Sequence, residues 1–361
     1  MKKRKLIIVI ISIMILAAVG VTYSYITRPI KIGVIIPIQS PLGNEENLFV
    51  RYYRDAHPKI GQRPVELLIE NNVETEKEIK TAYEEMKNKG ASIIIGGVTS
   101  EEGKWLSEQS AMYDLPTFGI TASTALLKDK KDAFFRFVPT NDLQAELVAK
   151  YYSKLGKKKL VLITDIKNKS YVEPFAKVIT EKFNGKVVNV PFRADEETYN
   201  KIVSNNPDSV FCILQAKDVI DVINNLKAKH PEIKIGSSSW GSAEILSMYS
   251  SPVLDGVLLF SGSSKIIGEK FKTEISNFQS KYDIEATKGT NYAASVIKAI
   301  YRGIEAVGDS NEALKKYFET PRDYETAYGK TQLNEYGDTL LNNMIVMVTT
   351  EGKVSNEEIL K

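Results

Sequence analysis

The sequence predicts an α/β protein with two lobes, each a mostly parallel sheet flanked by helices, and a ligand cleft between the lobes. Short apolar segments alternate with helical segments along most of the chain, which is typical of parallel sheets with right-handed crossovers. A chain of 361 residues is long enough for two domains with separate cores. The stretch from Phe134 to Gln144 ends one strand–helix series and begins another.

That stretch is the predicted hinge. Phe134–Val138 reads as a short aromatic strand, and Pro139 forces the residue before it out of the helical region. Thr140 or Asn141 can cap a new helix, and Gln144 follows Asn141 at the spacing of a capping box. One α/β unit therefore closes here and a second one opens.

The first series starts at residues 31–36, a nearly continuous apolar run of the kind found in strands covered on both faces. Pro37 ends this strand, and we expect a loop through Ser40 to Gly43. Thr75 begins a helix that Glu78 supports at capping-box spacing. We expect strands at 31–36, 65–70, 92–96 and 115–118, and helices at 75–88 and 101–112.

The second series repeats this alternation after the hinge helix, which runs to Gly156. We expect strands at 159–164, 186–191, 209–214, 233–236 and 257–260, and helices at 171–183, 198–203, 217–229 and 242–249. Three helices follow, at 268–282, 291–306 and 311–319, and then a Gly337-Asp338 turn and a strand at 343–349. The predicted lobe 1 is 29–140 with 264–330 returning to it, and lobe 2 is 141–263 with 331–361 returning.

Residues 1–28 are predicted to be a signal peptide or an N-terminal membrane anchor. Four basic residues at positions 2–5 precede an apolar run over 6–21, the layout of a secretory signal. No Ala-x-Ala site is present and no Cys follows the run, which excludes lipoprotein processing. The run is short for a spanning helix of about 20 residues, although residues 21–26 can extend it. We expect an uncleaved anchor, with a cleaved signal or a buried core helix as alternatives.

Composition excludes several classes of protein. The apolar share of 43% and the charged share of 26% are ordinary for a soluble globular body. Without the four basic residues at the N-terminus, the formal charge of +3 becomes −1, so no nucleic-acid footprint exists. Cys212 is the only cysteine, which excludes a disulfide within the chain and a cysteine-based zinc site. It lies in an apolar run, where we expect a buried thiol.

Residues suited to catalysis are sparse, and we expect neither an enzyme nor a cofactor or metal. His57 and His230 have no partner at metal-ligand spacing, and the sequence contains no P-loop, H-E-x-x-H motif or nucleophile elbow. Gly96-Gly97 lacks the further glycine of a dinucleotide fingerprint. Glu101-Glu102 fits the acidic first turn of a helix. A hydrolase or dehydrogenase is the enzymatic alternative.

Small hydroxyl residues stand where predicted strands end and helices follow. Thr99-Ser100 comes after the third strand, and Thr121–Thr124 comes after the fourth. Backbone N–H groups and hydroxyls at such places can hold a carboxylate, and crevices form at the carboxyl ends of strands in open α/β sheets. The alternative for Ser100 and Ser123 is that they only cap helices.

In these features the sequence resembles the type I solute-binding proteins of ABC importers, the leucine/isoleucine/valine-binding group. The similarity runs from about Lys31 to Lys353. Its clearest pieces are Ile95–Ser100, Phe135–Gln144, Asn291–Ala294, Gly337-Asp338 and Glu351–Lys353. The resemblance implies a periplasmic-binding-protein-like fold of type I, with three crossings between the lobes and a ligand enclosed in the cleft.

The resemblance also implies ligand-binding residues. In the family's amino-acid binders, a serine after the third strand and small residues after the fourth hold the ligand carboxylate, which corresponds to Ser100, Ala122 and Ser123. A second-lobe tyrosine corresponds to Tyr171. Tyr292 lies where the family places an aromatic residue near the ligand side chain.

One departure concerns the ligand's amino group. Ser239 and Trp240 stand where the family's acidic partner of that group should fall, and no carboxylate lies between residues 237 and 240. A buried ammonium without a charged partner is costly. Either another acid supplies the partner, or the ligand is not a standard amino acid. Trp240 and the two tyrosines can line an apolar part of the ligand or belong to the core.

We therefore expect a monomeric solute-binding component of an ABC importer, outside the cytoplasm and attached to the membrane. It would close its lobes around a small amino acid or organic acid and deliver it to ABC permease subunits, with the hinge absorbing the backbone change. The alternative is a ligand-sensing receptor component that presents its closed form to a membrane signalling partner.

Overall fold

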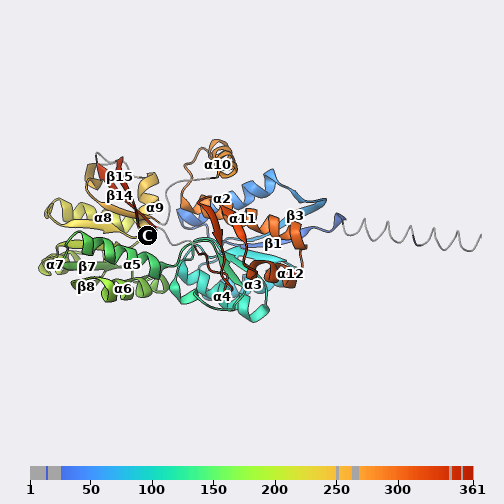
Figure 1. Cartoon of the computed structure of the whole chain (residues 1–361), viewed down its shortest axis with the longest axis horizontal. Coiled ribbons are helices and arrows are strands. Elements are labelled where there is room, and N and C mark those ends of the chain that lie inside the picture. Colours follow the sequence, from blue (N-terminus) through green and yellow to red (C-terminus); the bar gives the residue numbers. More distant parts are fainter. Residues whose placement is uncertain are drawn as a thin grey trace, which may run out of the picture.

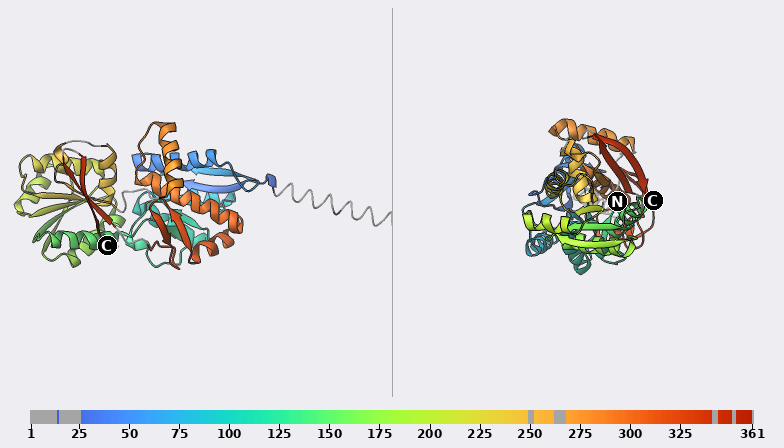
Figure 2. Two further views of the ribbon diagram at one scale, coloured as in Figure 1. Left: turned by 45° about the horizontal axis from the view of Figure 1, so that its top comes forward. Right: turned by 90° about the vertical axis from the view of Figure 1, so that its left-hand side faces the viewer.

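The computed structural model describes residues 14, 26–248, 252–261, 268–340, 344–350 and 353–360. Two α/β bodies lie side by side, each built around one main sheet (Figures 1 and 2). We call the body around the first sheet the first lobe and the body around the second sheet the second lobe. The predicted two-lobed α/β architecture is confirmed.

The first sheet has the order β2-β3-β1-β4-β5-β6. Its pairs are parallel apart from β2 with β3. Its strands are β1 (Ile30–Ile35), β2 (Lys59–Ile60), β3 (Arg63–Glu70), β4 (Ile93–Gly96), β5 (Thr117–Gly119) and β6 (Phe134–Arg136). One face is covered by α2 (Pro41–Ala56), α10 (Glu269–Tyr282), α11 (Lys288–Val307) and α12 (Asn311–Glu319), and the other by α3 (Glu76–Asn88) and α4 (Ser100–Tyr113). Both faces are therefore buried, as the apolar run of β1 predicts.

The second sheet has the order β15-β14-β11-β10-β9-β7-β8, parallel from β8 to β11 and antiparallel beyond. Its strands are β7 (Lys159–Thr164), β8 (Lys186–Pro191), β9 (Ser209–Ile213), β10 (Lys234–Ser237), β11 (Leu258–Ser261), β14 (Met344–Thr350) and β15 (Lys353–Leu360). The helices α5 (Asn141–Lys154) and α6 (Lys169–Lys182) cover one face. The opposite face is covered by α7 (Glu196–Ser204), α8 (Ala216–Lys227) and α9 (Ser239–Met248). Cys212 is buried in β9, as predicted.

The predicted loop at Ser40–Gly43 is wrong, because α2 begins there. Pro41 occupies the first helical position, where its missing N–H costs nothing, and the Gly43 amide donates to the Ser40 hydroxyl at 3.0 Å. The apolar pattern of the sequence did not predict this helix, because its buried face includes the polar residues Glu45 and Glu46. Also unpredicted are β15 and the hairpin of β12 (Asp323–Thr326) and β13 (Gly329–Gln332).

The capping box predicted for α5 is also wrong. Thr140 precedes the helix without a side-chain cap bond. Gln144 instead donates from its amide to the Pro139 carbonyl at 3.0 Å and accepts from the Ser239 hydroxyl at 2.6 Å. Asn141 donates to the Tyr171 carbonyl at 2.7 Å. The polar side chains after the hinge proline therefore hold the hinge against the second lobe.

Arg136, the last residue of β6, connects the hinge to a distant segment. Its guanidinium is buried, contacts the Asp338 carboxylate at 2.7 Å and donates to the Thr124 carbonyl at 2.7 Å. Asp338 also accepts from the Asp129 amide at 3.0 Å. A buried ion pair supported by these further hydrogen bonds holds both segments in one geometry.

The segment before β14 packs on the first lobe, since Leu333 belongs to the core on the α2 side and Asp338 pairs with Arg136. We therefore place the return to the second lobe after Asp338, not at residue 331. The second predicted crossing, between residues 263 and 264, lies outside the described residues. The predicted anchor over 6–21, apart from Met14, also lies outside them.

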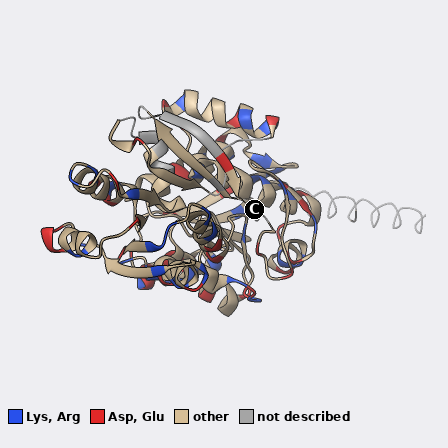
Figure 3. Cartoon of the chain, turned by 60° about the vertical axis from the view of Figure 1, so that its left-hand side comes forward, with Lys and Arg blue, Asp and Glu red and all other residues tan. Residues whose placement is uncertain are grey.

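Within the described residues, no helix combines the length and apolar character needed to cross a bilayer. Basic and acidic residues are interspersed along the helices of both lobes (Figure 3).

Candidate ligand-binding site

A cavity lies between the two lobes, near the hinge. Its volume is about 30 Å³, far below the roughly 300–1,000 Å³ of pockets that hold drug-sized ligands. The lining residues are Leu42, Val98, Thr99, Ser100, Thr121, Ser123, Val138, Asn168, Tyr171, Ser239, Trp240 and Lys288. Five of the seven predicted ligand residues are among them, namely Ser100, Ser123, Tyr171, Ser239 and Trp240. These five residues come from both lobes.

Helix N-termini converge on this cavity. Ser100 and Ser239 are the first residues of α4 and α9, Lys288 is the first residue of α11, and Asn168 immediately precedes α6. They converge because each helix follows the carboxyl end of a strand or packs beside one, so their starts meet at one edge of each sheet. The partial positive charges of the N-termini add there, and such a site favours an anion.

Ser100 does not cap α4, contrary to one of its two predicted roles. The cap is Thr99, whose hydroxyl accepts from the Glu102 amide at 3.2 Å, while the Glu102 carboxylate accepts from the amides of Thr99 and Val98. Within the described part of the chain, the Ser100 hydroxyl and the amides of Ser100 and Glu101 make no hydrogen bond. These donors are available to a ligand at the cavity wall.

The loop that follows β5 supplies a second donor. Ser123 lines the cavity, and its hydroxyl also makes no hydrogen bond among the described residues. The loop before it is fixed by Gly97, whose carbonyl accepts from the amides of Thr121 and Ala122 at 3.2 and 3.0 Å. Gly97 has φ +74°, a conformation that glycine adopts without strain.

Two predicted residues do not line the cavity. Ala122 packs behind the wall, where a Cβ placed on Gly103 would lie 2.4 Å from its own Cβ, and its carbonyl accepts from Arg136. Tyr292 belongs to the first-lobe core and lies against Tyr328, with ring centroids 4.9 Å apart. Burial raises the pKa of Tyr292 well above its ordinary value. Tyr292 therefore packs in the core of the first lobe and not at the described wall of the cavity.

The second lobe contributes an aromatic wall. The rings of Tyr171 and Trp240 meet edge to face with centroids 5.6 Å apart, and the Tyr171 hydroxyl lies 3.5 Å from the Ser239 hydroxyl. Burial raises the pKa of Tyr171, so it stays a neutral hydrogen-bonding phenol. With Leu42 and Val138 opposite, the cavity offers apolar surface beside its polar end.

Lys288 was not predicted from the sequence, and it is the one cationic residue among the lining residues that the structure describes. Its Nζ donates to the Ser239 carbonyl at 2.5 Å and so connects the first lobe to the second. A lysine in the first turn of a helix opposes the helix dipole. That unfavourable placement is the signal in the sequence that marks Lys288 as a candidate.

Further bonds join the lobes around the cavity. The Glu101 carboxylate of α4 accepts from the Ser170 amide of α6 at 3.3 Å. The Thr124 hydroxyl donates to the Ser170 carbonyl at 2.5 Å. The two lobes are therefore in direct contact beside the cavity.

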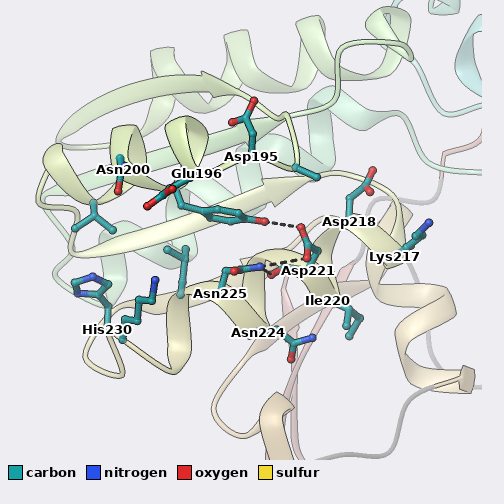
Figure 4. A pocket seen from close by; sticks show the side chains of 15 residues that line it. Asp195, Glu196, Asn200, Lys217, Asp218, Ile220, Asp221, Asn224, Asn225 and His230 are labelled. Carbon is teal, nitrogen blue, oxygen red and sulfur yellow. Dashed lines mark hydrogen bonds between the residues drawn. The ribbon is translucent and has the colours of Figure 1, made fainter.

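A larger hollow, of about 790 Å³, lies on the outside of the second lobe between α7 and α8 (Figure 4). Several of its side chains are acidic, and the Tyr199 hydroxyl donates to the Asp221 carboxylate at 2.5 Å. The lobes do not meet there, so lobe closure cannot enclose a ligand in it. Among the described residues, no group of three or more His, Cys, Asp or Glu could hold a metal ion.

Fold and cavity together define a two-lobed ligand-binding protein of the kind in which a solute lies between the lobes. Residues 29–353 match the family described as periplasmic binding protein, and the chain belongs to this family. It is thus a solute-binding protein, and membership of this family implies a place outside the cytoplasm. No curated protein matches the sequence.

Solved structures share the fold. A leucine-binding protein from Thermotoga maritima is 18% identical with a TM-score of 0.80, covering 92% of this chain and 99% of its own. A branched-chain amino acid binding protein from Streptococcus pneumoniae, in complex with isoleucine, is 19% identical with a TM-score of 0.79, covering 92% and 100%. A solute-binding protein of an ABC transporter from R. palustris, in complex with benzoate, is 17% identical with a TM-score of 0.77, covering 91% and 95%.

Proposed function

We propose that this protein is the solute-binding component of an ABC importer and that it binds a small carboxylate-bearing ligand by closing its lobes. The observation that carries the proposal is the set of unbonded donors at the start of α4, which faces the converging N-termini of α6, α9 and α11. Hydroxyls and amides at a helix N-terminus stabilise an anion without any catalytic group.

The ligand carboxylate binds at Ser100 and Ser123, and the rest of the ligand lies against Tyr171 and Trp240. This placement follows from the chemistry of the lining, in which polar donors come from the first lobe and aromatic surface from the second. Leucine, isoleucine and benzoate, named with the structural neighbours, all carry a carboxylate, which supports the proposal.

Lobe closure is the proposed mechanism. A cavity of about 30 Å³ holds roughly one water molecule, so a ligand of amino-acid size enters only when the lobes separate. Separation breaks the contacts of Ser239 with Lys288 and of Ser170 with Glu101, and the hinge at Phe137–Thr140 absorbs the change in backbone angles. The bound ligand then replaces these contacts as the bridge between the lobes.

The neighbours named as ABC transporter proteins favour transport over sensing. We propose that the protein acts as a monomer, keeps its N-terminal segment as a membrane anchor, and meets permease subunits in its closed form. N-terminal sequencing of protein from its native membrane tests the anchor, and a mature chain that begins between Val21 and Arg28 contradicts it.

Mass spectrometry of the small molecule released when the purified protein is unfolded tests the function. The expected result is one carboxylic acid, in stoichiometric amount, that rebinds to the refolded chain. Release of a neutral or cationic compound that rebinds instead would overturn the proposal.

A further inference from the structure

Asn168 brings an unused hydrogen-bond acceptor to the cavity. It lines the cavity from the second lobe and immediately precedes α6. Asparagine at this position usually caps the helix by accepting from a backbone amide of the first turn, but the Asn168 side chain makes no such bond. Its Oδ1 atom is buried and, among the described residues, has no hydrogen-bond partner. The described fold therefore leaves this atom to a ligand.

The backbone of Asn168 is fixed without the help of this side chain. The Asp165 carboxylate accepts from the amides of Lys167 and Asn168 at 2.7 and 2.6 Å. The Asn168 carbonyl accepts from the amides of Tyr171 and Val172, each at 3.1 Å. These bonds hold the start of α6, so the side-chain amide stands at the cavity on a rigid support.

A buried acceptor that lacks a partner carries a desolvation penalty. A ligand that donates a hydrogen bond to Oδ1 of Asn168 removes this penalty, whereas a ligand that is apolar at the same point retains it. Binding sites that contain such an atom therefore discriminate strongly against analogues that lack the donor.

The small volume of the cavity places this acceptor near the donors proposed for the ligand carboxylate. Ser100 and Ser123 line the cavity from the first lobe, and Tyr171, Trp240 and Asn168 line it from the second. The cavity is about 30 Å³, roughly the space of one water molecule, so these residues surround one small volume. A ligand whose carboxylate lies at the two serines therefore faces Asn168 with a group attached close to that carboxylate.

We infer that the ligand carries an N–H or O–H donor beside its carboxylate, as 2-hydroxy and 2-amino acids do, and that Asn168 accepts from this donor. The inference rests on the proposed function and narrows its ligand class. The first lobe holds the carboxylate and the second lobe holds the donor, so the ligand joins the lobes through two polar groups. A carboxylic acid without the donor fills the same space but leaves Oδ1 unpaired.

Matched ligands test the inference by calorimetric titration of refolded, ligand-stripped protein. One set is 4-methylpentanoate, both enantiomers of 2-hydroxy-4-methylpentanoate, and leucine. The other is 3-phenylpropanoate, both enantiomers of 2-hydroxy-3-phenylpropanoate, and phenylalanine. In at least one set, a donor-bearing member should bind roughly five- to hundredfold more tightly than the donor-free acid, the effect of pairing a buried acceptor. The hydroxy and amino members distinguish an O–H donor from an N–H donor.

Equal or tighter binding of the donor-free acids overturns the inference and leaves the proposed function standing. The amide of the hydroxy acid that binds most tightly separates the two levels of the argument. If this amide binds as well as the acid, or if none of the acids binds, the carboxylate site is wrong and the proposed function fails together with the inference. Weaker binding of the amide supports both.

Substitutions of Asn168 isolate its part in the preference. Asn168→Leu has a similar volume and no acceptor, so it should weaken binding of the donor-bearing acid and leave the donor-free acid bound at least as tightly as before. Asn168→Asp keeps an acceptor oxygen and should retain the preference for the donor-bearing acid. Asn200→Leu, on the exposed side of α7, is the control and should change neither affinity.

Thermal melts establish that the variants are folded, as expected from the backbone bonds that hold the start of α6. If Asn168→Leu keeps the wild-type preference, or weakens binding of both acids equally, Asn168 does not recognise the donor and the inference is wrong.

Discussion

At the scale of single residues, the site depends on which hydroxyls cap helices and which remain available. Thr99 and Ser100 are adjacent and chemically alike, yet only Thr99 caps α4. The capping box of Thr99 with Glu102 leaves the Ser100 hydroxyl at the cavity wall. The difference depends on which of the two residues begins the helix, and the sequence does not specify that.

Ser100→Ala should weaken carboxylate binding by roughly ten- to hundredfold, because it removes a hydrogen bond to a charged group. The melting temperature should stay unchanged, since the cap remains. Thr99→Ala should instead lower the free energy of unfolding by about 1 kcal/mol. Calorimetric titration and thermal melts measure the two quantities.

Tyr199→Phe, in the hollow between α7 and α8, is the matched control for affinity. It should leave ligand binding unchanged. Unchanged affinity in Ser100→Ala as well would remove Ser100 from the site.

Glu46 gives a second prediction at this scale. Burial raises its pKa well above the ordinary value of 4.5, against the opposing hydrogen bond from Thr121. A carboxyl group with a raised folded-state pKa stabilises the fold below its unfolded pKa, and that contribution is lost as the pH rises toward the folded value. Glu46→Gln stays neutral and should therefore unfold at a higher temperature than the wild type at pH 7.

The advantage of Glu46→Gln should shrink as the pH falls toward 4.5. Melts across this pH range check it, and Glu78 provides a control of opposite sign. Hydrogen bonds from the Glu74 and Thr75 amides and the Thr75 hydroxyl lower the pKa of Glu78. Glu78→Gln should therefore be less stable than the wild type at neutral pH. A constant difference for Glu46→Gln at all pH values would contradict the assignment.

At the scale of elements, the strand–helix alternation was predictable, and the polar helix was not. The strands β7 and β8 and the helix α12 have the predicted bounds, because apolar runs and turn residues mark them. The helix α2 stayed hidden because buried carboxylates break its apolar period. Those carboxylates bond to residues remote in sequence, such as Thr121 and Thr287, which no local pattern reports.

The same limit applies to the site. Ser100 and Ser123 follow strands, and their place at a sheet edge was predictable from that alone. Lys288 lies at the wall because α11 packs across the first lobe toward α9 of the second, a contact between residues far apart in the chain. For Tyr292 the sequence left two alternatives open, because an aromatic residue on a helix face has the same pattern whether it lines a cleft or packs in a core.

The hinge elements depend on the pair of Arg136 and Asp338. Asp338→Asn leaves a buried guanidinium without its counter-charge and should cost about 3–5 kcal/mol of unfolding free energy. Denaturant titration measures this cost. Glu335→Gln, in an exposed pair with Lys131, is the control and should change stability by less than about 1 kcal/mol. Equal effects of the two substitutions would show that the buried pair does not hold the hinge.

At the scale of the whole molecule, polar contacts between the two lobes lie beside the cavity in the part of the chain that the structure describes. Bonds from α4 to α6 and from α11 to α9 hold the lobes together on either side of a cavity that is too small for a solute. Each bond joins a polar group of one lobe to a polar group of the other, and none of the hydrophobic clusters of described residues spans both lobes. Opening therefore breaks a few polar contacts and exposes no hydrophobic core.

Closure around a carboxylate between the lobes is the central claim, and small-angle X-ray scattering tests it most directly. The protein, stripped of ligand by unfolding and refolding, is measured alone and with a saturating amount of the acid that binds most tightly in calorimetry. We expect a smaller radius of gyration with the acid, because the lobes move together. The radius of gyration should not change at the same concentration of the amide of that acid. A radius of gyration that stays constant while calorimetry shows binding would contradict closure.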